Sequence, residues 1–162
     1  EMTFLSLARL HYEHEQFERS AYYYDLVSSD SKEYWPTSLF EASWAYYQRE
    51  DLEKALGNLL TLHSPFLEKE YFPESYIVMA IIYFEACRYD ETRSMVDKFL
   101  PRFTKLMKET EKYANSSLQP EQLYDQLNRI YLGEAEGLEN DSQVLYYDCF
   151  IFSHLPPCFC CS

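Results

Sequence analysis

Glycine is scarce in this sequence, with only three among 162 residues. Proteins built from sheets and tight turns depend on glycine, whereas a chain rich in Leu, Tyr, Glu and Ala favours helices. Long hydrophobic runs are missing as well, because no stretch approaches the roughly 18 to 20 apolar residues that a membrane-spanning helix needs. These deficits predict an all-α fold without a membrane span.

Basic residues are also few, since 14 Lys and Arg face 27 Asp and Glu and leave a net charge of −13. Such a surface repels phosphate backbones, so nucleic acid and anionic membranes are poor partners. The five cysteines are an odd number, which argues against a disulfide framework. The sequence has no Gly-rich phosphate loop and no Ser-His-Asp order. We therefore predict neither an enzyme nor a bound cofactor.

Three segments, residues 4–27, 39–62 and 76–99, repeat one pattern. A large turn residue recurs at intervals of 35 and 37 residues, and small residues recur at two further positions. A fixed spacing of this length predicts a helical repeat. The turn residues are Phe17, Leu52 and Tyr89, the early small residues are Ala8, Ser43 and Ala80, and the late ones are Ser20, Ala55 and Thr92.

Each repeat is predicted to contain two helices of about 13 residues joined by a short turn. Pro36 and Pro73 each precede a segment by three residues, and the first turn of a helix accepts proline without losing a hydrogen bond. The small residues allow the paired backbones to approach closely while large neighbours fill the space beside them. Because one pair cannot bury its apolar face alone, neighbouring pairs must stack.

The repeated residues resemble the tetratricopeptide repeats, a family with a unit of about 34 residues. The match covers about residues 2 to 100 and occurs three times. The sequence of residues 73–91 also resembles that of repeat proteins of bacterial cell envelopes. One position departs from the family, because Glu15, Glu50 and Cys87 stand where the turn usually has glycine. We therefore expect those turns to have helical or 3-10 dihedral angles rather than left-handed ones.

The resemblance implies a right-handed α-solenoid of three helix pairs followed by C-terminal capping helices. The repeats are expected at about 1–34, 36–69 and 73–100, and the capping helices at 101–135. Proline disrupts a helix interior, so a new helix is expected to open at Pro101 and another at Pro120. Residues 144–152 could form a helix or a strand. Residues 136–162 complete the chain, and their cysteine-rich end is expected to be disordered.

In tetratricopeptide arrays the first helix of each unit lines a concave groove, which implies a binding surface here. The surface is aromatic and apolar with an acidic rim, so the expected partner is another protein with apolar anchors flanked by basic residues. The chaperone-binding members clamp a carboxylate with Lys, Arg and Asn, and Leu5, Glu41 and Glu74 replace such residues. The implied groove residues are Leu5, Arg9, Tyr12, Glu13, Phe40, Glu41, Trp44, Tyr47, Glu74, Ile77, Ile81, Phe84 and Glu85.

Other interpretations remain open. The groove aromatics could instead contact the next repeat or lie under the capping helices. The amphipathic pattern already runs at Phe4, so the chain could be an architectural fragment of a longer array in a bacterial envelope complex. A signal peptide before such a fragment would place it in the periplasm or envelope rather than in the cytoplasm. The least favoured alternative is metal binding, through His154, Cys158, Cys160 and Cys161 or through His11, His14 and Glu15.

Overall fold

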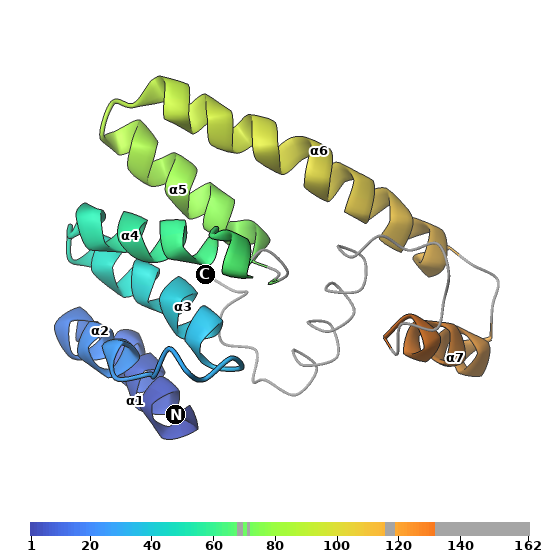
Figure 1. Cartoon of the computed structure of the whole chain (residues 1–162), viewed down its shortest axis with the longest axis horizontal. Helices are drawn as coiled ribbons and strands as arrows, with labels where there is room; N and C mark the ends of the chain where they lie inside the picture. The colour runs from blue at the N-terminus through green and yellow to red at the C-terminus, as the bar shows by residue number, and fades with distance from the viewer. Residues whose placement is uncertain (68–69, 71, 116–118, 132–162) are drawn as a thin grey trace. The chain divides into compact units, whose positions relative to one another are not determined.

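The computed structural model describes residues 1–67, 70, 72–115 and 119–131, and these residues form helices without a strand. Contacts group the chain into two compact units, Glu1–Phe99 and Leu100–Ser162. The first unit opens with α1 (Met2–Glu13), α2 (Phe17–Asp25), α3 (Trp35–Gln48) and α4 (Leu52–Leu62), shown in Figure 1. A 3-10 turn, Pro65–Leu67, then leads to α5 (Pro73–Glu85) and α6 (Tyr89–Ala114). The predicted all-helical fold is confirmed for these residues.

The helices of the first unit pack as consecutive pairs. Helix α1 packs on α2, α3 packs on α4, and α2 also packs on α3. Between α5 and α6 the rings of Tyr76 and Phe99 lie 6.2 Å apart, and the Thr92 hydroxyl, which donates to Arg88 O at 3.0 Å, also lies 3.5 Å from the carbonyl of Ala80. The predicted segments 4–27, 39–62 and 76–99 therefore each contain two helices.

Small residues allow close contact within the first two pairs. Their early and late repeat positions are fully buried, which fits the predicted close approach of the paired backbones. These residues are Ala8, Ser20, Ser43 and Ala55. In the third pair the equivalent Ala80 and Thr92 are partly buried. Large side chains complete the core around them, among them Tyr24, Tyr46, Leu59, Met79 and Tyr83.

The three turns correct one prediction. Glu15, Glu50 and Cys87 have φ angles of 57°, 61° and 58°, so all three are left-handed. After each of them the chain makes the two hydrogen bonds of a Schellman motif, such as Gln16 N–H to His11 O and Glu15 N–H to Tyr12 O, both 2.9 Å. Our expectation of helical or 3-10 angles was wrong because these bonds satisfy the last helix carbonyls and outweigh the steric cost of a non-glycine residue.

The helix α6 corrects a second prediction, because it runs without interruption through Pro101. Proline removes one helix hydrogen bond and costs about 3 kcal/mol in a helix interior. Apolar residues nevertheless continue at helical spacing across it as Val96, Leu100, Phe103 and Met107, and such a pattern favours one helix. Pro101 lies just beyond the division between the two compact units.

The second unit contains the end of α6 and α7 (Pro120–Tyr131), which begins at the proline where a helix was predicted to start. The predicted loop at 114–119 is described only in part. The predictions for 132–162 lie outside the described residues, including the helix or strand at 144–152 and the cysteine-rich end with His154.

We predict that Glu50→Gly stabilises the protein. Glycine relieves the roughly 1 to 2 kcal/mol steric cost of the left-handed conformation, offset in part by its larger entropy in the unfolded chain. The expected net gain is about 0.5 to 1 kcal/mol in the free energy of unfolding. The matched control is Glu53→Gly within α4, which should lose about 1 kcal/mol. Urea denaturation of both variants measures the difference, and equal destabilisation would contradict the role of this turn.

We also predict an alkaline limit to stability. Tyr46 is 3% exposed and its hydroxyl donates to Asp25 Oδ2 at 2.5 Å. Burial and this carboxylate raise the pKa of Tyr46 above its ordinary value. The resulting stabilisation is complete below about pH 10, the pKa of tyrosine in an unfolded chain, and is lost at higher pH because only the unfolded chain readily releases the proton.

The variant Tyr46→Phe should lose about 1 kcal/mol at pH 7 through the missing hydrogen bond. Its free energy of unfolding should then fall less steeply than that of the wild type above about pH 10. Tyr22→Phe is the control, because Tyr22 is 59% exposed. Denaturation curves between neutral and alkaline pH would disprove the explanation if Tyr46→Phe and wild type lose stability in parallel.

Candidate functional site

The first helices of neighbouring pairs are joined by an ion pair. Arg9 of α1 donates from Nε to Glu41 Oε2 at 2.8 Å and from Nη2 to Oε1 at 2.6 Å. The two side chains are only 27% and 15% exposed. Tyr24 of α2 also hydrogen-bonds Glu41 and is buried, and both effects raise the pKa of the Tyr24 hydroxyl. The Glu41 carboxylate therefore connects α1, α2 and α3.

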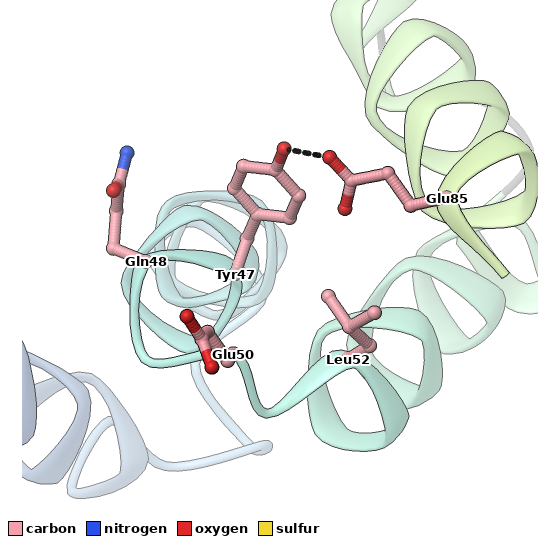
Figure 2. A pocket seen from close by; sticks show the side chains of 5 residues that line it. All are labelled: Tyr47, Gln48, Glu50, Leu52 and Glu85. Atoms are coloured by element: carbon pink, nitrogen blue, oxygen red, sulfur yellow. Dashed lines mark hydrogen bonds between the residues drawn. The ribbon is translucent and has the colours of Figure 1, made fainter.

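A second kind of contact recurs at the carboxyl ends of the first helices. Tyr12 of α1 hydrogen-bonds the Gln48 side chain of α3. Figure 2 shows the equivalent contact one unit later, where the Tyr47 hydroxyl donates to Glu85 Oε1 of α5 at 2.7 Å. The hydrogen bond to Glu85 raises the pKa of Tyr47. Tyr12 and Tyr47 occupy the same repeat position, and so do Gln48 and Glu85, so residues at equivalent positions connect both interfaces.

The aromatic residues predicted for the groove are partly engaged within the protein. Phe40 contacts the ring of Phe72 at a centroid distance of 5.3 Å, and Trp44 meets Tyr47 edge-on at 6.1 Å. Phe40, Trp44 and Tyr47 are half-buried and pack against the core. The α3 part of the predicted surface is therefore only partly accessible.

The predicted residues differ widely in exposure. Leu5 is 4% exposed and belongs to the core, so its assignment to an accessible groove is corrected. By contrast, Ile77, Ile81 and Phe84 of α5 are 48%, 36% and 60% exposed. Glu13, Glu74 and Glu85 are exposed carboxylates. The open apolar part of the predicted surface thus lies on α5, with an acidic residue near each end.

A shallow hollow of about 530 Å³ lies beside the Tyr47–Glu85 bond, as Figure 2 shows. Three of its lining residues, Gln48, Glu50 and Leu52, were not predicted as site residues. The repeat alignment contained a signal for the hollow, because Leu52 stands where the other units have an aromatic turn residue. In the first and third units the aromatic turn residue is Phe17 or Tyr89, and its ring makes an edge contact with Tyr12 or Phe84 respectively.

The described residues do not bring metal-ligating side chains together in a group of three or more. His11 instead stacks on Tyr23 at 5.2 Å, and its Nδ1 lies 2.8 Å from Gln16 Oε1. Cys87 is exposed at the left-handed position of a turn. The arrangement that the first helices offer is consequently a surface of apolar and acidic side chains.

We predict that the Arg9–Glu41 pair contributes measurably to stability. Hydrogen bonds to charged groups contribute about 1.5 to 3 kcal/mol when they are shielded from water. A double-mutant cycle with Arg9→Met and Glu41→Gln should give a coupling energy in that range. The comparison pair Arg88–Glu91 at the start of α6 is 51% and 41% exposed and should couple much more weakly, because solvent screens the charges. Equal coupling in the two cycles would contradict this assignment.

No helix in the part of the chain that the structure describes is both long and apolar enough to cross a membrane. Comparisons with protein-family models, with curated proteins and with solved structures gave no significant match.

Proposed function

We propose that this protein is a non-catalytic scaffold that binds a peptide or helix of a partner protein along α1, α3 and α5. In this proposal the three helix pairs are tetratricopeptide-like units stacked in a right-handed solenoid. Three identical left-handed turns support equivalent units, and the repeated Tyr12–Gln48 and Tyr47–Glu85 bonds support equivalent stacking.

The observation that carries the proposal is the exposed apolar row of α5. Ile77, Ile81 and Phe84 follow one another at helical spacing and face solvent. Aromatic and branched side chains provide a large contact area at little entropic cost, which is typical of binding hot spots. A row of this kind on a helix suits the apolar face of an incoming helix.

Charge supports a basic partner. Glu74 and Glu85 lie near the two ends of the apolar row, and the chain as a whole carries a charge of −13. Lys or Arg beside the partner's apolar anchors would be attracted over a Debye length of about 8 Å at physiological salt. Such attraction mainly accelerates the encounter, while the apolar contact sustains the complex.

A second candidate function is an architectural segment within a longer repeat array. It is favoured by α1, where Thr3, Ser6 and Leu10 are exposed although their repeat equivalents in α3, Ser38, Glu41 and Ala45, are buried or half-buried. A preceding helix pair would cover that face in the same way. This candidate requires no free partner.

Site-specific photo-crosslinking tests the binding function. A photoreactive phenylalanine analogue at position 84, or in a second variant at position 47, should give a discrete protein adduct in cells that make the native protein. The matched control is Phe66, which is 74% exposed outside the first helices and should not give that adduct. Once mass spectrometry has identified the partner, Phe84→Ala should weaken its binding by about 2 kcal/mol or more.

Phe66→Ala should bind this partner like the wild type. The scaffold proposal fails if neither position 84 nor position 47 yields an adduct, or if position 66 yields the same one.

A further inference from the structure

Equivalent positions on the three first helices become progressively more exposed along the chain. The series Leu5, Phe40 and Ile77 runs from buried through half-buried to 48% exposed. The series Tyr12, Tyr47 and Phe84 runs from half-buried to 60% exposed. Because these residues share one place in the repeat, their own unit does not explain the trend.

The next unit does explain it. Side chains of α3 contact this side of α1, through Glu41 and Gln48. Side chains at and near α5 contact the same side of α3, through Phe72 and Glu85. Within Glu1–Phe99, α5 is the last of the first helices. Its exposed side is therefore the counterpart of two surfaces that side chains of the following unit contact.

The polar contacts of the series also change along the chain. Arg9 donates to Glu41, but the equivalent positions in the next two units are Trp44 and Ile81. Tyr12 and Tyr47 each hydrogen-bond the following first helix, but the equivalent Phe84 has no hydroxyl group. The side of α5 formed by Ile77, Ile81 and Phe84, which we name the stacking face, therefore requires no polar partner at its centre.

We infer that the stacking face receives an amphipathic helix of a partner protein, which packs on α5 as α5 packs on α3 and carries Lys or Arg near its ends. This inference rests on the proposed function and names the contact mode and the partner chemistry. The centre of the partner helix must be apolar, as are Val78, Met79 and Ile82, buried residues in the middle of α5 itself. Its basic residues would approach Glu74 and Glu85.

A second copy of this chain fits the stacking face less well. Each copy carries a charge of −13, so two copies repel each other. The exposed side of α1 that a second copy would offer contains the polar residues Thr3 and Ser6 beside a single apolar one, Leu10. Charge and polarity together favour a basic, apolar helix from another protein.

Stapled peptides of the α5 sequence, residues 73–85, provide the probe. The basic peptide carries Glu74→Lys, Ile77→Lys, Ile81→Lys and Glu85→Lys, and retains the inward residues Ser75, Val78, Met79 and Ile82. The acidic control peptide has Ile77→Glu and Ile81→Glu. Fluorescence anisotropy with the full chain should show that the basic peptide binds at least tenfold more tightly than the acidic one.

Protein variants locate the binding. Phe84→Glu should weaken binding of the basic peptide at least tenfold, whereas Phe66→Glu should leave it unchanged. Circular dichroism checks folding, and Ile77→Glu replaces Phe84→Glu if the latter unfolds. The inference is overturned if the basic peptide does not bind, if the acidic peptide binds equally well, or if the stacking-face variant binds like the wild type.

Sedimentation of the wild-type chain tests the competing occupant. Concentration-dependent association that Phe84→Glu abolishes would identify a second copy and overturn the choice of a basic partner. The photo-crosslinking experiment distinguishes failure of the scaffold function from failure of the proposed packing on the stacking face. An adduct at position 84 or 47 together with failure of the peptides would retain the scaffold function and reject only this stacking mode.

Discussion

The structure depends on a packing constraint, namely that a pair of short helices has more apolar surface than its two members can cover. Neighbouring pairs therefore contact each other, as α2 does with α3 and α4 with α5, and side chains of the following pair reach one side of α1 and of α3. Glu41 and Gln48 meet that side on α1, and Phe72 and Glu85 meet it on α3. The exposure of Ile77, Ile81 and Phe84 follows from the same constraint at the last pair of the first unit.

The left-handed turns make the helix pairs alike despite their different sequences. Glu15, Glu50 and Cys87 share neither charge nor shape, yet their φ angles agree within a few degrees. The hydrogen bonds to the preceding helix impose this conformation, so the side chain at the turn has little influence on it. Equivalent turns then place Tyr12, Tyr47 and Phe84 at equivalent positions, which is the basis for comparing their surroundings.

Much of the fold could be predicted because its signals are local or periodic. The spacing of Phe17, Leu52 and Tyr89 located the helix pairs, and Pro120 marked the start of α7. The errors arose where backbone hydrogen bonds or a continued helical periodicity override a local preference, as at Glu50 and at Pro101 respectively. The site was less predictable, because the partners of Arg9 and Tyr47 lie 32 and 38 residues away and no local pattern identifies them. Leu5 likewise looked like a groove residue until the following helices were in place.

The polar groups along the first helices differ in whether they lie between helices or remain exposed to solvent. The Arg9 charge is neutralised by Glu41 inside the stack, where a charge without a partner would be costly. Glu85 is already held by Tyr47, yet it remains exposed, so it can attract a basic group without leaving its own bond. Ile77 and Ile81 beside it are apolar and 48% and 36% exposed, and removing such side chains from water favours association. In the proposed complex, attraction at the rim and burial at the centre would therefore act on the same incoming helix, the first at a distance and the second on contact.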